Sequence, residues 1–138
     1  MIAYIDASVL LRLVFGERRP LAEWPRMERC VTSALTDVEC RRALDRRRFQ
    51  DAVEAAELGL RRAVLFKVLE RCEAIDLSRE VLARASEPFH SALGTLDAIH
   101  LATALLVKAR TEPELRLATH DTALGLAARS HGFDVLGC

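Results

Sequence analysis

Short apolar runs alternate along this chain with longer segments in which apolar residues recur at steps of three and four. The short runs are typical of buried strands, and the three- and four-residue spacing indicates amphipathic helices. The predicted strands are 2–5, 30–33, 73–77, 115–120 and 133–136. The predicted helices are 7–15, 34–49, 51–72, 78–89, 95–110 and 121–132; Gly59 can split the third, and two prolines break the connection 18–28. This alternation predicts α/β architecture with a mostly parallel sheet.

The segment 95–110, TLDAIHLATALLVKAR, raises the first functional question. Its apolar stripe predicts a helix with Thr95 as the N-cap, yet Asp97 lies in the first turn and His100 follows one turn later. One explanation is structural, because an acidic side chain near a helix N-terminus interacts favourably with the helix dipole. The other is that the helix carries a carboxylate into a site. The positions of the remaining acidic residues bear on the choice.

Composition and charge limit the class of protein. The chain has 138 residues, 51% of them hydrophobic, which predicts one domain (1–138) with an aliphatic core. The 20 basic and 20 acidic residues cancel, which excludes an overall basic field but not a local patch for nucleic acid. None of the four cysteines forms a C-x-x-C pair, so reduced thiols are expected rather than a zinc site. The N-terminus lacks the basic region of a signal peptide, and no apolar run reaches the ~18 residues that span a bilayer, so a soluble, cytoplasmic protein is expected.

Four acidic residues lie where parallel strands would bring them together. Two directly follow predicted strands, and two lie early in predicted helices. In an open parallel sheet, functional groups gather beyond the carboxyl ends of the strands, so all four would meet at one edge. In the order just given, they are Asp6, Asp121, Glu39 and Asp97.

Such a cluster needs a counter-charge. Carboxylates at short range repel one another and raise each other's pKa values. A divalent cation such as Mg²⁺ or Mn²⁺ prefers oxygen ligands and resolves the repulsion, and it can activate water and polarise a phosphoryl oxygen. Each residue taken singly has a structural explanation as a helix cap, a dipole partner or a solvated charge. The four together favour a metal-dependent site for phosphodiester hydrolysis.

Four short segments carry a resemblance to a known family. They are YIDAS (4–8), SALTDVECRRAL (33–44), TLDAIHLATAL (95–105) and LATHD (117–121). In this order they resemble the signature segments of PIN-domain ribonucleases, and more narrowly those of the VapC-type toxins of bacterial toxin–antitoxin pairs. The resemblance implies a three-layer α/β/α sandwich around a mostly parallel sheet of four to five strands, with the helical region 51–72 as a projecting arm.

The resemblance also implies which residues form the site. The family's acidic quartet, which holds Mg²⁺ or Mn²⁺ and is catalytic, matches Asp6, Glu39, Asp97 and Asp121. Polar residues often found beside that quartet match Ser8 and Thr119. The site would cut RNA by attack of water on the phosphorus, without a side-chain nucleophile. Asp121 could bind the metal directly or could contact the residues that bind it.

Partners follow from the same resemblance. Members are similar in cutting single-stranded or looped RNA, often tRNA or rRNA, in forming homodimers, and in being silenced by a cognate, VapB-like antitoxin. No membrane partner is implied. Many relatives carry an Arg shortly before the LDAIHLA segment, where this chain has Gly94, so His90 or an Arg from elsewhere would have to contact a phosphate instead.

Basic residues and histidines have two interpretations each. The run RRALDRRR (41–48) is typical of a solvated helix face, but its arginines could contact RNA phosphates or antitoxin carboxylates through their bidentate fork. The candidates for such contacts are Arg12, Arg41, Arg42 and Arg46. His100 is expected to pack or to hydrogen-bond behind the site rather than act as a general base, and His120 to point away from it.

Other functions compete with a toxin ribonuclease. A PIN-like binding module without activity and a PIN nuclease without a toxin role remain open. A phosphotransferase of the haloacid-dehalogenase type needs a second Asp two residues after the first, where this chain has Ser8. A response-regulator receiver needs a Lys after a late strand, but Lys67 and Lys108 both lie within predicted helices.

Overall fold

The computed structural model describes residues 1–138 and contains five strands and six α-helices. The strands are β1 (Ile2–Ile5), β2 (Arg29–Ser33), β3 (Cys72–Ile75), β4 (Arg116–Ala118) and β5 (Val135–Leu136). The helices are α1 (Ala7–Phe15), α2 (Ala34–Gln50), α3 (Ala55–Glu70), α4 (Arg79–Ala85), α5 (Thr95–Arg110) and α6 (Thr122–Ser130), with a 3₁₀ turn at Trp24–Arg26. Every predicted strand and helix is present, and Gly59 does not interrupt α3.

The five strands form one sheet in the order β3-β2-β1-β4-β5, and every pairing is parallel. The chain first moves outwards from β1 to β2 and β3, and then returns to the other side of β1 for β4 and β5. The direction of winding therefore changes between β1 and β4. In open α/β sheets, the loops at the carboxyl ends of the strands diverge at such a point and leave room for a site.

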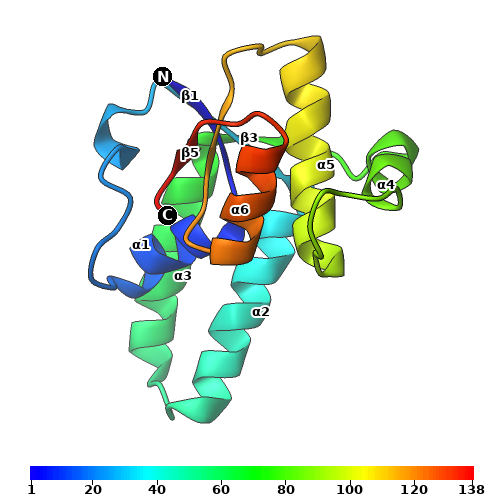
Figure 1. Ribbon diagram of the computed structural model, residues 1–138. Coiled ribbons are helices and arrows are strands. Elements are labelled where there is room, and N and C mark those ends of the chain that lie inside the picture. The colour runs from blue at the N-terminus through cyan, green and yellow to red at the C-terminus, as the bar shows by residue number, and fades with distance from the viewer.

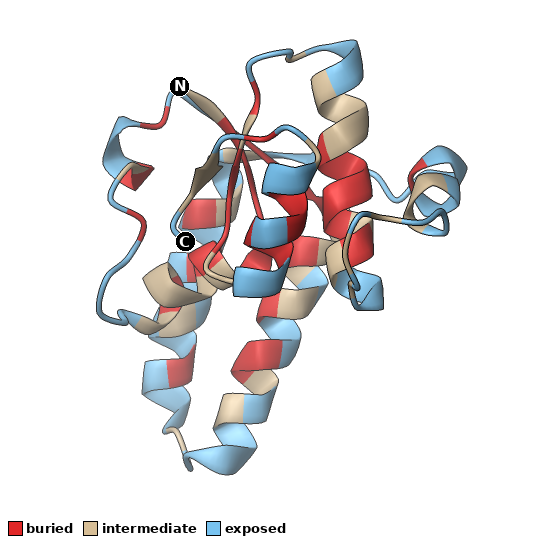
Figure 2. Ribbon diagram, in the orientation of Figure 1, coloured by how far each residue is buried: buried red, intermediate tan, exposed pale blue.

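Alternating side chains of the central strand pack into two separate hydrophobic cores. Ala3 and Ile5 of β1 pack with residues of α1, α2 and α3 on one face of the sheet, whereas Tyr4 packs with residues of α5 and α6 on the other. The side chains alternate because successive residues of a strand point to opposite faces. The result is the predicted α/β/α arrangement, and Figure 2 shows buried residues concentrated in the strands and on the helix surfaces that face them.

The α2 and α3 helices run side by side as a hairpin that extends away from the sheet (Figure 1). The projecting arm predicted over 51–72 is therefore only half of this feature: its helix covers 55–70, and α2 forms the other half. Leu44 on α2 and Leu58 and Leu65 on α3 are buried in the core between α1, α2 and α3. Leu60 and Phe66 of α3 remain exposed.

Helix caps fix where the chain leaves the sheet. Asp6, Ser33 and Asp121 lie at or shortly after the ends of β1, β2 and β4, and each accepts a hydrogen bond from a backbone N–H in the first turn of the next helix. Such caps satisfy donors that have no partner within the helix. The prediction that Thr95 caps α5 is wrong: Gly94 is the N-cap residue and Thr95 is the first helical residue.

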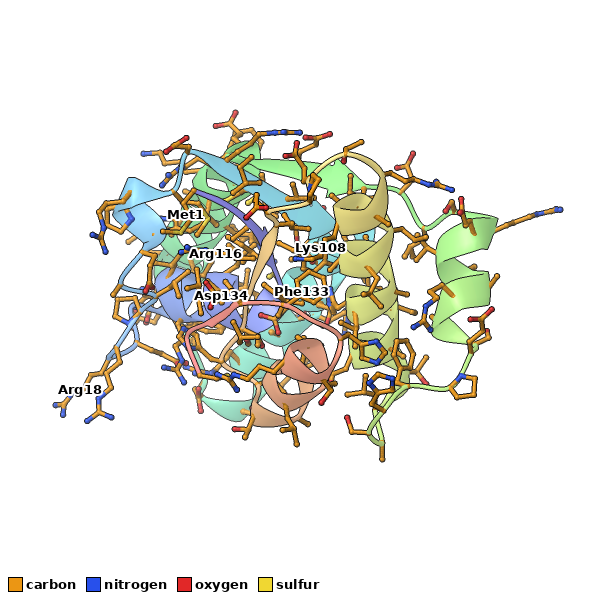
Figure 3. The ribbon with its side chains drawn as sticks, turned by 45° about the horizontal axis from the view of Figure 1, so that its top comes forward. Met1, Arg18, Lys108, Arg116, Phe133 and Asp134 are labelled. Carbon is orange, nitrogen blue, oxygen red and sulfur yellow. The ribbon has the colours of Figure 1, made fainter.

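The amino ends of the strands lie at the opposite edge of the sheet. Figure 3 views this edge: Arg116 Nε lies 3.1 Å from Asp134 Oδ2, and Lys108 Nζ lies 4.9 Å from the centre of the Phe133 ring. These contacts fasten α5 and β4 to the segment that leads into β5. None of the helices combines the length and the apolarity that crossing a membrane would require.

Candidate active site

Asp6 is the most buried acidic residue at the carboxyl edge of the sheet, with 4% of its surface exposed. Its Oδ1 accepts hydrogen bonds from Ser8 Oγ at 2.6 Å and from the Val9 backbone N–H at 3.4 Å, and its Oδ2 accepts one from Thr119 Oγ1 at 2.7 Å. Burial raises the pKa of Asp6, while the hydrogen bonds from Ser8 and Thr119 act to lower it. The carboxylate is thus held rigidly, with both oxygens oriented.

Ser8 and Thr119 connect the beginning of α1 to the loop between β4 and α6. Their hydroxyl oxygens lie 3.3 Å apart, Ser8 Oγ accepts from the His120 backbone N–H at 2.8 Å, and Thr119 Oγ1 accepts from the Asp121 backbone N–H at 2.9 Å. Asp121 in turn caps α6 through its Oδ1, which accepts from Leu124 N at 2.9 Å. The two hydroxyl groups therefore place Asp6 and the Asp121 loop relative to each other.

Asp97 occupies the first turn of α5 and is partly buried. Burial raises the pKa of Asp97, and the charges of Asp121, Asp6 and Glu39 raise it further; only His100 acts in the other direction. A helix dipole alone would favour the ionised form of an N-terminal carboxylate. The raised pKa of Asp97 instead reflects burial first and then the charges of the other three acidic residues.

Glu39 on α2 contacts a buried histidine of α5 at the same edge of the sheet. His100 is 1% exposed, its Nε2 lies 2.5 Å from Glu39 Oε1, and its Nδ1 lies 2.7 Å from the hydroxyl oxygen of Tyr4. This places His100 behind the acidic residues, as expected. Sequence reasoning missed Tyr4, because an aromatic residue within a buried strand carries no sign of a polar role.

The carboxylates could hold a cation only after local rearrangement. In this structure no group of three or more His, Cys, Asp and Glu side chains is placed to hold a metal ion. The donor chemistry nevertheless fits Mg²⁺ or Mn²⁺, because all four candidates are carboxylates, whose oxygens these ions prefer. Asp97 accepts no hydrogen bond and Asp121 uses only Oδ1, so both retain oxygens for a ligand.

The arginine run on α2 is largely neutralised. Arg41 Nε lies 2.6 Å from Asp37 Oδ1, and Arg42 Nη2 lies 2.9 Å from Asp45 Oδ2, both within the same helix. Arg46 is exposed and has no acidic partner within 4.0 Å. Paired side chains on a helix surface are typical of a solvated face, which leaves Arg46 as the residue of this run most available to an anionic partner.

Arg12 is the basic side chain of α1 nearest to the acidic edge. Its Nη1 donates to the Arg19 backbone oxygen at 3.1 Å. Its charge acts to lower the pKa of the Cys138 thiol, on which Asp6 and Asp121 act in the opposite direction. Arg12 therefore lies within electrostatic range of the loop that carries Asp121.

The other histidines lie outside the acidic cluster. The His120 ring contacts the Gly137 backbone oxygen through Nδ1 at 2.9 Å, which agrees with the prediction that it points away. The His90 ring stacks on His131 with ring centres 4.1 Å apart, and its Nδ1 lies 3.0 Å from the Ser130 backbone oxygen. His90 is thus held against the carboxyl end of α6, at the far end of that helix from Asp121.

Comparison with known proteins gives relatives over nearly the whole chain. The family profile described as "PIN domain" matches residues 3–130. The protein named Ribonuclease VapC35 of Mycobacterium tuberculosis is 37% identical over 132 residues, which cover 92% of this chain and 90% of that protein.

Two solved structures have a similar fold. One is the crystal structure of VapBC2 from Rickettsia felis bound to a DNA fragment from their promoter, with a TM-score of 0.68, 12% identity and 99% of both chains covered. The other is that of VapBC-5 from Mycobacterium tuberculosis, a member of the VapBC family of toxin–antitoxin systems, with a TM-score of 0.58 and 17% identity over 97% of this chain and 94% of that one. At these low sequence identities, the similarity to the two structures shows a shared fold and nothing more.

Proposed function

Because the chain belongs to the PIN-domain family, we propose that it is an endoribonuclease that hydrolyses RNA phosphodiester bonds and acts as the toxin of a toxin–antitoxin pair. The observation that carries this proposal is the 37% identity to Ribonuclease VapC35 of Mycobacterium tuberculosis over 92% of this chain. The effect of Asp121, Asp6 and Glu39 on the pKa of Asp97, which is smaller than that of burial, supports a shared acidic site at the carboxyl edge of the sheet. A ribonuclease relative supports the choice of RNA as the substrate.

In this proposal Asp6, Asp97 and Asp121 hold Mg²⁺ or Mn²⁺, and Glu39 binds it directly or through water. When bound, the cation would neutralise the carboxylates and polarise the phosphoryl group that is attacked. The chain's own residues orient the site: Ser8 and Thr119 fix both oxygens of Asp6, and Thr119 also holds the backbone of Asp121. The buried position of Asp6 keeps its carboxylate from rotating into solvent.

The test compares two Asp→Asn variants. Asp97→Asn removes a carboxylate of the cluster, whereas Asp134→Asn removes an exposed carboxylate at the opposite edge of the sheet, paired with Arg116. Cleavage of end-labelled single-stranded RNA and of total tRNA and rRNA is measured with Mg²⁺, with Mn²⁺ and with EDTA. We expect cleavage by the wild type and by Asp134→Asn with a cation only, and none by Asp97→Asn. Full activity of Asp97→Asn, or activity in EDTA, would refute the proposed site.

The same variants separate the toxin role from its alternatives. Expression of a toxin arrests growth, and Asp97→Asn abolishes that arrest while Asp134→Asn does not. A binding module without activity would bind Mn²⁺ in a calorimetric titration but cleave none of the RNAs. A nuclease without a toxin role would cleave RNA in vitro and leave growth unchanged.

An antitoxin partner and a homodimer belong to the same proposal. The α2–α3 hairpin presents Leu60, Val64 and Phe66 to solvent on α3, and Phe49 at the end of α2 is 74% exposed. Exposed apolar side chains gathered on one feature are typical of surfaces that bind another protein. Co-expression with small open reading frames cloned from beside the gene, followed by purification, tests whether a product of one binds the chain and restores growth.

A further inference from the structure

Three side chains link the hydrophobic core to the acidic cluster. Tyr4, in the central strand β1, is fully buried, and its hydroxyl oxygen lies 2.7 Å from Nδ1 of His100 on α5. The two rings meet edge to face with their planes at 68°. Nε2 of His100 lies 2.5 Å from Oε1 of Glu39 on α2, whose side chain is 19% exposed. The link therefore crosses from the sheet through α5 to α2.

The chemistry of the three groups sets the direction of the hydrogen bonds. Burial raises the pKa of Tyr4 well above its usual range, so the phenol keeps its proton and can donate it to Nδ1. A carboxylate only accepts hydrogen bonds, so Nε2 of His100 carries the hydrogen of its contact with Glu39. A neutral imidazole has one donor and one acceptor nitrogen. The chain of bonds is thus Tyr4 O–H to Nδ1, then Nε2–H to the Glu39 carboxylate.

We propose that Tyr4 and His100 are positioning residues for Glu39: the Tyr4 hydroxyl selects the Nε2–H tautomer of His100, and His100 holds Oε1 so that Oε2 is the oxygen offered to a divalent cation. The inference rests on the function proposed above. A free Glu side chain must give up rotamer freedom when it ligates an ion, and a fixed hydrogen-bond partner removes that freedom in advance. Partners of this kind typically change metal affinity by 10- to 100-fold when they are lost.

The contacts separate this role from simple packing. An apolar side chain would fill the space between β1 and α5 without needing polar partners, whereas both ring nitrogens of His100 have one. Thr111, at the carboxyl end of α5, is a control on the same helix. Its hydroxyl donates to the Val107 backbone oxygen at 3.2 Å and makes no hydrogen bond to Tyr4, His100 or the acidic residues.

The first measurement is the affinity for Mn²⁺ by calorimetry, on the full chain without RNA. We expect His100→Leu to weaken binding by about 10- to 100-fold and Tyr4→Phe, which removes a single oxygen, to weaken it less. His100→Gln should restore most of the affinity, because its amide can accept from Tyr4 and donate to Glu39. Thr111→Val should stay within about twofold of the wild type, since Thr111 does not contact the link.

The second measurement is the protonation of the His100 ring in the metal-free protein, read from its side-chain ¹⁵N chemical shifts. The wild type should show a protonated Nε2 and an unprotonated Nδ1, and Tyr4→Phe should lose this preference while remaining folded. A wild-type ring protonated at Nδ1 alone would overturn the proposal. On a Glu39→Gln background, His100→Leu should add no further loss of Mn²⁺ affinity, because His100 acts only through the carboxylate.

The outcomes distinguish this proposal from the proposed function. If Asp97→Asn loses Mn²⁺ binding while His100→Leu and Tyr4→Phe retain it, the metal site stands and the positioning role is wrong. If Asp97→Asn also retains Mn²⁺ binding, the acidic cluster is not the metal site, and both proposals fail.

Discussion

Replacement of Thr119 by Val should destabilise the protein far more than loss of one hydroxyl usually does. Thr119 is fully buried, and its Oγ1 both donates to Asp6 Oδ2 at 2.7 Å and accepts from the Asp121 backbone N–H at 2.9 Å. Valine has nearly the same shape, so the core stays filled. The substitution removes a donor to a buried carboxylate and leaves a backbone N–H without its acceptor.

These two losses set the magnitude. A hydrogen bond to a charged group is worth about 1.5–3 kcal/mol, and an orphaned buried donor costs about 1–3 kcal/mol. Because the Asp121 N–H lies in a partly exposed loop, we expect a decrease of about 2–4 kcal/mol in the free energy of unfolding. For a chain of this size, this corresponds to a decrease in Tm of roughly 8–16 °C.

The loss should depend on pH in a defined direction. Burial raises the pKa of Asp6, and the hydrogen bond from Thr119 partly offsets that effect, so Thr119→Val raises the pKa further. A folded-state pKa above the unfolded value means that stability is present at low pH and is lost as pH rises through the folded-state pKa. The extra loss in Thr119→Val therefore appears where Asp6 is ionised and shrinks towards acid pH.

Chemical denaturation at several pH values, followed by circular dichroism, measures both effects. Thr103→Val is the control, since Thr103 is equally buried but its hydroxyl donates to the Ile99 backbone oxygen, which helix geometry already pairs, and makes no hydrogen bond to an acidic residue. Its cost should stay below about 1 kcal/mol at every pH. If the two variants lose the same stability, or if the loss in Thr119→Val does not change with pH, the network around Asp6 is not what holds this edge together.

Three further outcomes are expected. In EDTA at pH 8, Asp97→Asn should be more stable than the wild type by about several tenths of a kcal/mol, and this advantage should disappear towards pH 4. The reason is that the raised pKa of Asp97 disfavours its ionised form in the folded state. Denaturant titrations at both pH values test the sign of the difference. Leu44→Ala, in the core that joins α2 to α1 and α3, should lower the free energy of unfolding by about 2–4 kcal/mol. Leu60→Ala, at a position 69% exposed, should lower it by less than about 0.5 kcal/mol. Equilibrium unfolding of both variants measures the difference. Mn²⁺ at 100 times its Kd should stabilise the wild type by about 2.7 kcal/mol and leave Asp97→Asn unchanged, which a thermal scan with and without the ion detects.

Local sequence patterns were sufficient to predict the elements of the fold. β-branched and aliphatic runs such as 2–5 and 30–33 form the predicted central strands, because a strand covered on both faces needs apolar side chains throughout. The ends of helices were less accurate. Gly94 rather than Thr95 caps α5, since the choice between adjacent residues depends on the direction from which the preceding loop arrives.

The candidate site was predictable to the extent that topology determines it. Asp6 and Asp121 follow neighbouring parallel strands, so their shared edge follows from the strand order alone. Two features depended on tertiary contacts that sequence spacing does not encode. The link from Tyr4 to His100 joins residues 96 positions apart, and that from His100 to Glu39 joins residues 61 positions apart.

The hydrogen bond from Thr119 to Asp6 joins residues 113 positions apart, just beyond the first and fourth strands of the chain. A ribosome making this protein adds Asp6 early and Thr119 only near the end of synthesis. A chain that ends before Thr119 therefore lacks the hydroxyl that orients Asp6, so truncation near the C-terminus removes the order of this acidic edge even where the first strands are complete.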